Sequence, residues 1–329
     1  MAMEIGKVPN DILQKIVLDK LTTSRPEVKE SGGIGIDTAT IDFGDNFAVM
    51  SCDPITGATE NLGKLAINVA VNDIATKGSE PVCALTSILL PPSTQYEELE
   101  KLIVDLNNEA EALNINIVGG HTEITDAVNR IVVTTTVIGK LAKDETMPDV
   151  EIGDLVVVTK DVGIEGTSII AHEKEELIGH KLGYGELISA RELSDDLSVL
   201  KEGLLGKRYN AKYMHDITEG GLLGAAWETA EALGQGLIVF KDRIPVREIT
   251  KRICSVLDID PLKLVSSGSM LIVINQLDYV KLQAKLESEG IKSTVIGRVT
   301  EFDGAYISED NNLKLISPPG ADEIYKVHY

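Results

Sequence analysis

The chain has 329 residues, which is long for one hydrophobic core, so two domains are expected. Its 52 acidic and 31 basic residues give a net charge of −21, which argues against a nucleic-acid or anionic-membrane surface. The charge leaves nucleotides open as ligands, because bound Mg²⁺ can hold a polyphosphate in an acidic site.

The three cysteines are isolated and have no CxxC or Cys/His spacing: Cys52, Cys83 and Cys254. They supply no zinc signature and fit a reducing compartment. The first residues lack a basic region followed by an apolar core, and no apolar run approaches the roughly 20 residues that span a bilayer. We therefore expect a cytoplasmic protein.

In chain order, residues 9–21 have the spacing of an amphipathic helix. Residues 22–35 lose that periodicity and end in a glycine-rich segment with Gly33 and Gly35. The segment is either a surface linker or a flap whose amides cover a phosphate. Asp37 follows it, ahead of a strand at residues 40–42, and Asp53 is expected at the end of a strand over residues 47–51.

Residues 61–81 predict one buried helix that is closed by Gly78 and stopped by Pro81. Leu62, Leu65 and Val69 share an apolar face, and Asp73 continues it. A carboxylate in such a place costs several kcal/mol unless it is paired. Two interpretations remain open: a hydrogen bond from Asp73 to a neighbouring loop, or a ligand for a hard cation such as Mg²⁺.

The rest of the first half predicts strands at 82–90, 115–118 and 130–138 and a helix at 96–113. Gly119 and Gly120 are expected to form a tight turn from which His121, Thr122 and Glu123 project. Pro148 and Gly153 place a domain junction near residue 148. In the second half, expected strands alternate with expected helices. The strands are at 154–160, 211–215, 237–240, 269–274 and 293–299, and the helices are at 185–200, 246–257 and 278–289, with one more that starts near residue 221. This alternation predicts an α+β or α/β fold in each half.

Five acidic residues lie in an apolar helix face or near strands and glycine turns: Asp37, Asp53, Asp73, Glu123 and Asp216. If they converge, their repulsion requires cations, and two Mg²⁺ would relieve it and clamp a triphosphate. The chain contains no GxxxxGK[ST] phosphate loop and no motif of a kinase catalytic loop or a Ser/His/Asp hydrolase.

Three motifs, NLGKLAINVAVNDIATKGSEP, GGHTE and HDITEGG, resemble the aminoimidazole-ribonucleotide synthetase superfamily. Its members include thiamine-monophosphate kinase, selenophosphate synthetase and the hydrogenase-maturation protein HypE. IPVREITKRICSVLDIDPLKL is most similar to the HypE branch. The resemblance implies a PurM-like α+β fold with an ATP- and Mg²⁺-binding dimerisation domain (residues 1–148) and a C-terminal domain (149–329). It also implies a homodimer whose N-terminal domains complete a β-barrel.

The resemblance implies that Asp37, Asp53, Asp73 and Asp216 are metal ligands, with Glu123 as a further candidate. It also implies that ATP lies in the cleft, with its phosphates near Gly33, Gly35, Gly119, Gly120, His121 and Thr122.

Three positions depart from the family pattern. Ile36 stands where the Gly-Asp-Asp-Ala element has its first Asp, and His121 stands where HypE has Asp. The last residues, GADEIYKVHY, lack the terminal cysteine that carries the HypE carbamoyl group, so that reaction is not expected in its known form.

The sequence leaves three functions open. The first is a HypE-like, Mg²⁺-dependent enzyme that uses ATP to activate an amide-like or phosphate oxygen of a small-molecule or protein-borne acceptor. The second is a nucleotide-binding partner in a maturation complex with little turnover. The third is a purine-pathway cyclase or a thiamine-monophosphate kinase.

Overall fold

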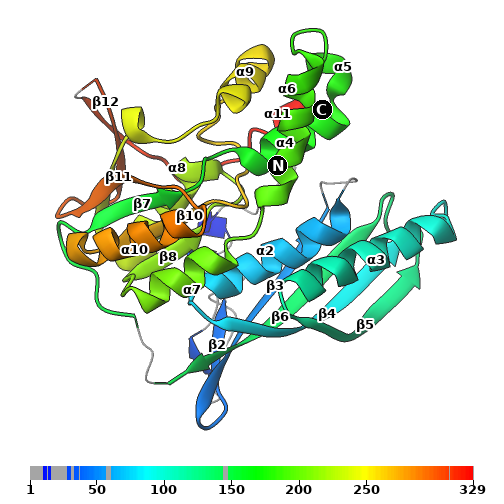
Figure 1. Ribbon diagram of the computed structural model, residues 1–329, viewed down its shortest axis with the longest axis horizontal. Helices are drawn as coiled ribbons and strands as arrows, with labels where there is room; N and C mark the ends of the chain where they lie inside the picture. The colour runs from blue at the N-terminus through cyan, green and yellow to red at the C-terminus, as the bar shows by residue number, and fades with distance from the viewer. Residues whose placement is uncertain are drawn as a thin grey trace.

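The computed structural model describes residues 10–12, 14–15, 28–30, 33–36, 38–56, 61–143, 147–310 and 312–328. Two β-sheets with helices packed on them make up this part of the chain (Figure 1). The expected α+β class is confirmed. Of the helix expected at residues 9–21, only α1 (Asn10–Ile12) and residues 14–15 lie within the described residues.

The N-terminal sheet has six strands in the order β1-β2-β3-β6-β4-β5. They are β1 (Val28–Glu30), β2 (Ala39–Asp42), β3 (Asn46–Ile55), β4 (Glu80–Leu90), β5 (Asn116–Ile124) and β6 (Val132–Ala142). Helix α3 (Tyr96–Ala112) connects β4 to β5, which pair in parallel, and the other neighbours are antiparallel. Burial alternates along β4 and β6, so one face lies under the helices and the other faces solvent.

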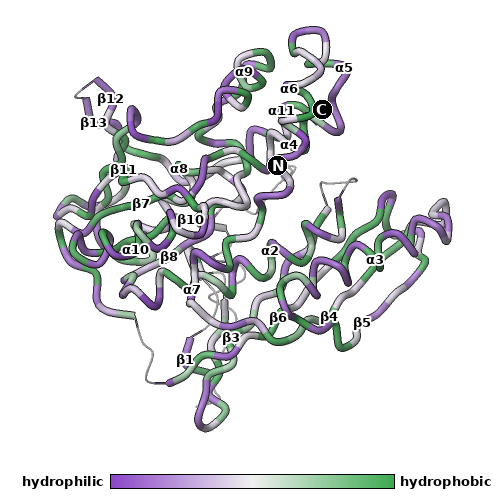
Figure 2. The backbone as a smooth tube through the Cα atoms, viewed as in Figure 1, coloured by the Kyte–Doolittle hydropathy of each residue, from purple (hydrophilic) through white to green (hydrophobic). Residues whose placement is uncertain are grey.

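Helix α2 (Leu62–Thr76) is buried on nearly all sides, as its sequence predicts. It ends as expected, because Gly78 adopts a left-handed φ of 60° directly after the Lys77 cap. The helix contacts β3 and α3 on the N-terminal side and α7 (Leu200–Arg208) and β8 (Tyr213–Asp216) of the second half. Helix α3, by contrast, alternates hydrophilic and hydrophobic residues and has one exposed side (Figure 2).

The C-terminal sheet has seven strands in the order β13-β12-β9-β11-β7-β10-β8. Besides β8 they are β7 (Leu155–Thr159), β9 (Gly236–Phe240), β10 (Met270–Ile274), β11 (Ser293–Thr300), β12 (Ala305–Glu309) and β13 (Asn312–Leu315). The remaining helices of this half are α4 (Ile164–Glu173), α5 (Glu175–Ile178), α6 (Tyr184–Arg191), η3 (Glu192–Asp196), α8 (Gly221–Leu233), η4 (Lys241–Arg243), α9 (Glu248–Leu257), α10 (Gln276–Ser288) and α11 (Tyr325–His328).

One continuous apolar core crosses the boundary between the two halves. It joins α2 and the inner face of the N-terminal sheet to side chains of β8, β10 and α10, among them Met214, Met270 and Leu282. A large apolar contact of this kind couples the two halves, whereas a small polar contact would leave them free to move.

Several sequence expectations need correction. The helix expected over residues 185–200 is divided into α6, η3 and the start of α7. Part of the expected loop at 22–35 forms β1, and the hairpin of β12 and β13 has no counterpart in the sequence expectations. Among the described residues, no helix is long and apolar enough to cross a membrane.

The packing of α7 on α2 gives a stability prediction. Gly203 lies in α7 where a Cβ atom would overlap the Ala75 carbonyl oxygen of α2, so Gly203→Ala should lower the free energy of unfolding by about 1–3 kcal/mol. Gly185 in α6 has open space around it, so Gly185→Ala should be neutral or slightly stabilising. Urea unfolding of both variants checks this; equal effects of the two variants would contradict the close packing.

Candidate functional site

Asp73 is a buried carboxylate on the face of α2 that packs against β3. Its residue is 3% exposed, and Ser51 of β3 donates a hydrogen bond from Oγ to Asp73 Oδ2. Thr76 Oγ1 donates to the Asp73 carbonyl oxygen at 2.6 Å, within the same helix. Burial of an ionised carboxylate is costly, and a hydroxyl compensates the charge less than a cation does. The position therefore fits a ligand for a hard cation.

Asp53 lies in the same strand as Ser51, but not at a strand end as expected. Strand β3 continues to Ile55, and Asp53 is paired within it to Thr135 of β6. Because side chains alternate along a strand, Asp53 and Ser51 share a face, about 7 Å apart along the chain. Asp53 is half-buried. Ser51, which bonds Asp73, thus lies two residues before Asp53 on the same face of β3.

The C-terminal half contributes Asp216, which is 1% exposed at the end of β8. Strand β8 packs against α2, the helix that carries Asp73. The neighbouring His215 is buried and its Nε2 lies 3.1 Å from Glu228 Oε2, so His215 is a packed strand residue.

The glycine-rich segment also reaches β8. Gly33 and Ile36 exchange two backbone hydrogen bonds, and Tyr213 Oη donates to the Gly35 carbonyl oxygen at 2.7 Å. Gly35 has a φ of 70°, and a Cβ there would overlap the Glu228 carbonyl oxygen of α8. Glycine is needed here for both backbone conformation and space. Asp37 lies outside the described residues.

Strand β5 does not join this region within one chain. Gly119 and Gly120 lie inside the continuous strand β5, so the expected tight turn is wrong; the register with β4 shifts at this point instead. Thr122, His121 and Glu123 are exposed in the same strand, and His121 Nε2 lies 3.1 Å from Glu123 Oε2.

The sheet register shows how widely the candidates are separated. Asp53, Thr135, Thr86 and Gly120 form one row across four strands. Three strand spacings separate the first from the last by about 14 Å, and Glu123 is three residues farther along β5. Ligands of one Mg²⁺ all lie about 2 Å from it. Glu123 therefore cannot share an ion with Asp53 in the same copy.

The described residues contain no group of three His, Cys, Asp or Glu side chains that could already hold a metal ion. The donor chemistry of Asp53, Asp73 and Asp216 nevertheless suits Mg²⁺, which takes carboxylate oxygens, keeps several waters and binds substrate phosphates. These three residues are the ones that would hold the ion.

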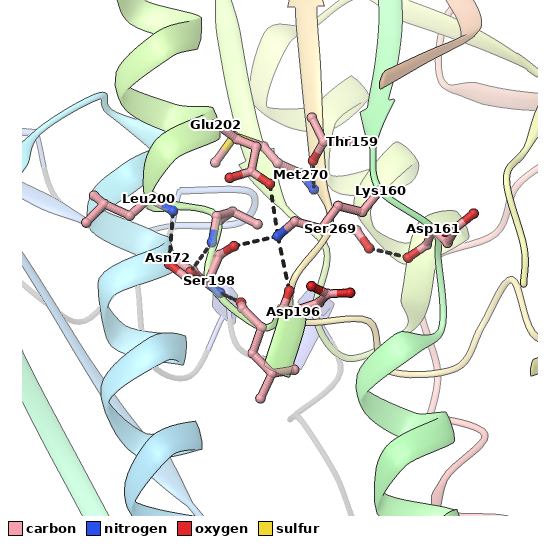
Figure 3. A network of polar contacts seen from close by, with 12 residues as sticks. Asn72, Thr159, Lys160, Asp161, Asp196, Ser198, Leu200, Glu202, Ser269 and Met270 are labelled. Carbon is pink, nitrogen blue, oxygen red and sulfur yellow. Dashed lines mark hydrogen bonds and ion pairs between the residues drawn. The ribbon is translucent and has the colours of Figure 1, made fainter. Parts of the chain in front are cut away.

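A polar network fixes α2 against the second half (Figure 3). Asn72 Nδ2 donates to the Leu197 carbonyl oxygen at 2.8 Å, and Asn72 Oδ1 accepts from the Val199 amide at 2.8 Å. Both partners are backbone groups of the segment between η3 and α7. The residue next to Asp73 in sequence is thus the one that sets the position of α2 relative to this segment.

Lys160 holds the same segment from the other side (Figure 3). Its Nζ donates to the carbonyl oxygens of Asp196 at 3.0 Å and Ser198 at 2.5 Å, and it pairs with buried Glu202 at 2.9 Å. Lys160 has a left-handed φ of 54° directly after β7. Asn72 and Lys160 are absent from the sequence expectations, because their partners lie more than 30 residues away along the chain.

Two further carboxylates missed by the sequence lie in the C-terminal half. Glu165 is the second residue of α4, and its Oε2 accepts a hydrogen bond from the Ser267 amide at 3.0 Å. Asp322 accepts from the amides of Gly220 and Ile324 at 2.7 and 2.8 Å. Burial raises the pKa of Glu165 to about 7 and that of Asp322 to about 6. The only local signal for Glu165 is its place between Gly163 and Gly166.

Three further side chains have structural roles. Cys254 is a core residue at 1% exposure, and burial raises the pKa of its thiol to about 12. Lys64 pairs with exposed Asp195 at 2.7 Å, and Lys77 with Glu30 at 3.0 Å.

The chain matches two domain models of one protein family and several proteins of known name. The N-terminal domain model of AIR synthase related proteins matches residues 35–141, and the C-terminal domain model matches residues 151–308. A protein of Methanocaldococcus jannaschii named for hydrogenase expression and formation is 27% identical over 98% of this chain and 97% of its own length. Carbamoyl dehydratase HypE of Rhodobacter capsulatus is 26% identical over 74% of this chain and 72% of its own.

Solved structures share the fold. A HypE–HypF complex contains a chain with a TM-score of 0.76 and 20% identity, covering 94% of this chain and 99% of that one. HypE in complex with ATP has a TM-score of 0.69 and 19% identity, covering 95% of each chain. Together with the two domain models and the hydrogenase-related relatives, this fold confirms the expected resemblance to the PurM-like superfamily near HypE.

The raised pKa values give a pH prediction. Glu165 binds its proton more tightly when folded than when unfolded, so its stabilising effect is complete below about pH 4.5 and is lost as the pH rises through about 7. Glu165→Gln should therefore reduce the fall in unfolding free energy between pH 5 and pH 8 by up to about 3 kcal/mol. Chemical unfolding at both pH values tests this, with Glu176→Gln on exposed α5 as the unchanged control. A fall as steep as in the wild type would contradict it.

Proposed function

Because the chain belongs to the family of AIR synthase related proteins, we propose that it is a Mg²⁺-dependent, ATP-using enzyme of the HypE type. In this proposal it phosphorylates an amide-like or phosphate oxygen of an acceptor and so activates that oxygen. The observation that carries the proposal is the buried carboxylate of Asp73. It belongs to α2, which both halves enclose, and it accepts a hydrogen bond from Ser51 of β3, the strand that bears Asp53. The ATP complex of HypE, a protein of the same fold, supports the choice of nucleotide.

Each residue has a role in the proposed site. Asp53, Asp73 and Asp216 hold Mg²⁺, with Asp37 as a further expected ligand. The ion would neutralise the phosphate oxygens and orient the transferred phosphoryl group. The turn from Gly33 to Ile36, which Tyr213 at the start of β8 holds by a hydrogen bond to the Gly35 carbonyl oxygen, belongs to the glycine-rich segment that would contact the phosphates. Catalysis in such a site rests on positioning and charge stabilisation.

A second function is a nucleotide-binding partner in a maturation complex with little turnover. The specific observation in its favour is Ile36, which pairs by backbone hydrogen bonds with Gly33 and brings an aliphatic side chain to a position where the family element has an aspartate. A HypE–HypF complex is the relevant precedent among proteins of this fold. The relatives named for hydrogenase expression and for HypE support hydrogenase or a related maturation as the setting in either case.

We further propose that two copies pair through the N-terminal sheet. Its outer face and the edge strand β5 expose Leu85, Val118 and Ile124, the last two at about 60%. An uncovered sheet edge and an apolar face both favour pairing with another chain. His121 and Glu123 on β5 stay candidate site residues only in such a pair, because their own Asp53 is too distant.

Asp73→Asn tests the metal site. Removing one of several close carboxylates should leave the ligand-free protein as stable or slightly more stable, because like-charge repulsion falls. Mg²⁺-ATP at 100 times its Kd should stabilise the wild type by about 2.7 kcal/mol, which is several degrees in Tm, and this shift should vanish in the variant.

Ser51→Ala is the matched control, because it removes the hydrogen bond to Asp73 but keeps the charge. It should destabilise the ligand-free protein by about 1–3 kcal/mol and keep the Mg²⁺-ATP shift. Thermal unfolding of the three proteins with and without Mg²⁺-ATP gives the comparison. A nucleotide shift that survives in Asp73→Asn would rule out the role of this carboxylate.

Sedimentation velocity tests the pairing. The wild type should sediment as a dimer at micromolar concentration, and Val118→Asp should produce monomers by placing a charge in the contact. Val280→Asp on α10 is the control, since Val280 is exposed to the same 61% as Val118 but lies in the other half. A monomeric wild type would refute the pairing.

A further inference from the structure

One face of the C-terminal sheet is covered by helices at one end and exposed at the other. The strand register places one side chain from each of six strands in a row on this face: Ile274, Leu155, Arg298, Ile238, Tyr306 and Leu315. Ile274 and Leu155 pack in the apolar core to which α2 and α10 contribute. Arg298 is exposed, and Leu315 at the other end of the row is 63% exposed. The helices of that core therefore cover this face only as far as β11.

The opposite face of the same strands is covered. Leu237, Val239 and Ala305 are fully buried in a second core, where α8 packs on β9 and β12. In Figure 1, β12 lies at the upper left, away from α2, α7 and α10. Among the described residues, this end of the sheet thus has a helix layer on one face, whereas β7 and β10 have one on both.

The uncovered face is apolar and aromatic. Leu313 of β13 is 50% exposed, and Phe302, between β11 and β12, is 49% exposed with its ring 6.2 Å from the ring of Tyr306. An exposed apolar surface of this kind is typical of a contact with another molecule. The four strands β11, β9, β12 and β13 span three strand spacings, or about 14 Å. A helix with its side chains is about 10–12 Å wide, so one helix is wide enough to cover most of this face.

Two arginine side chains lie over the ring of Phe240 at the side of this face. The guanidinium carbon of Arg243 is 4.5 Å from the ring centroid, and that of Arg298 is 5.7 Å from it. Both arginines are exposed, and neither has an ion pair with a carboxylate among the described residues. This is notable in a chain with 52 acidic and 31 basic residues. The two cations are therefore complementary to an anionic group of another molecule.

Acidic residues in the same region are paired or lie outside the strands. Glu309 of β12 pairs with Lys241 and Lys314. Three further acidic residues are exposed in η4 and between β11 and β12: Asp242, Glu301 and Asp303. The positive charge available to a partner is therefore confined to the strip over Phe240, and the partner needs its acidic residues along one edge.

The geometry favours a helix over a strand as the partner element. A strand added to the open edge of β13 would lie four strand spacings, or about 19 Å, from β11. Its carboxylates would be out of reach of Arg298. A helix laid across β9 and β12 instead brings one edge beside Arg298. A second copy of this chain fits less well, because each copy carries a net charge of −21.

We propose that this face of β9, β12 and β13 is a docking surface for an amphipathic helix of a partner protein. The apolar side of that helix covers Ile238, Tyr306 and Leu315, and acidic residues along one edge pair with Arg243 and Arg298. The helix supplies the layer that this end of the sheet lacks, as α8 does on the other face. The surface is separate from the proposed ATP site, because β8, which carries Asp216, is at the other end of the sheet.

Two designed peptides test the surface on the full chain. Each is a labelled amphipathic helix of about five turns with leucine along one side; one has glutamate along the edge of that side, and the other has lysine at the same positions. In fluorescence anisotropy, the wild type should bind the glutamate peptide at least tenfold more tightly than the lysine peptide. A chain of net charge −21 without such a surface would favour the lysine peptide.

Charge reversal locates the binding. Arg298→Glu should weaken the glutamate peptide at least tenfold and strengthen the lysine peptide. Arg208→Glu on α7 is the matched control, because Arg208 is also exposed and lies outside the surface; it should change neither affinity by more than about twofold. Leu315→Asp should weaken the glutamate peptide at least tenfold through the apolar side. Thermal unfolding of each variant checks that it is folded.

Three results would overturn the proposal: tighter binding of the lysine peptide to the wild type, no binding of the glutamate peptide, or equal effects of Arg298→Glu and Arg208→Glu. Self-association that Leu315→Asp abolishes in sedimentation velocity would assign the surface to a second copy instead and so refute a partner helix. Arg298→Glu should keep the Mg²⁺-ATP thermal shift. A wild type that binds the glutamate peptide but shows no such shift would refute the ATP-using function alone.

Discussion

The burial of α2 between two sheets is the constraint on which the rest of the molecule depends. A helix with water on one side needs only an apolar stripe, but α2 is enclosed by both halves and its polar side chains must all find partners. Asn72 finds backbone groups of the second half, and Asp73 finds Ser51 of the first. The two adjacent residues thus have different roles. Asn72 joins the two halves, and Asp73 places a carboxylate beside β3.

Because Asn72 and Asp73 are adjacent on α2, the contact that joins the two halves also positions the carboxylate of the proposed site. Carboxylates from β3, α2 and β8 can act together only if the two halves keep a fixed relation. The contacts of Lys160 and Asn72 fix the 196–199 segment by its backbone. Because the partners of Asn72 and Lys160 are backbone groups, these contacts depend on the path of the chain and not on which side chains the segment carries. Buried Glu202 neutralises the charge of Lys160.

The sequence predicts those parts of the fold whose signals are local. The α2 helix is recognised because its apolar arcs and its glycine end lie within 20 residues, and the burial of Asp73 follows from the same arcs. Gly119 and Gly120 mislead, because a glycine pair is locally typical of a turn. Here glycine is instead needed where β5 comes close to the Thr86 backbone of β4. Asn72 has its partners 125 and 127 residues away, and no local pattern reports such a distance.

The docking of the Gly33–Ile36 turn on β8 has a mechanical consequence. The chain leaves the N-terminal sheet after β1, reaches the C-terminal half at this turn, and returns to the sheet at β2. The halves are thus attached at the turn as well as along the main connection after β6. This contact adds to the apolar core and to the hydrogen bonds of Asn72, which already couple the two halves. A relative movement of the halves would therefore have to break the hydrogen bond of Tyr213 to Gly35 as well as disrupt that core.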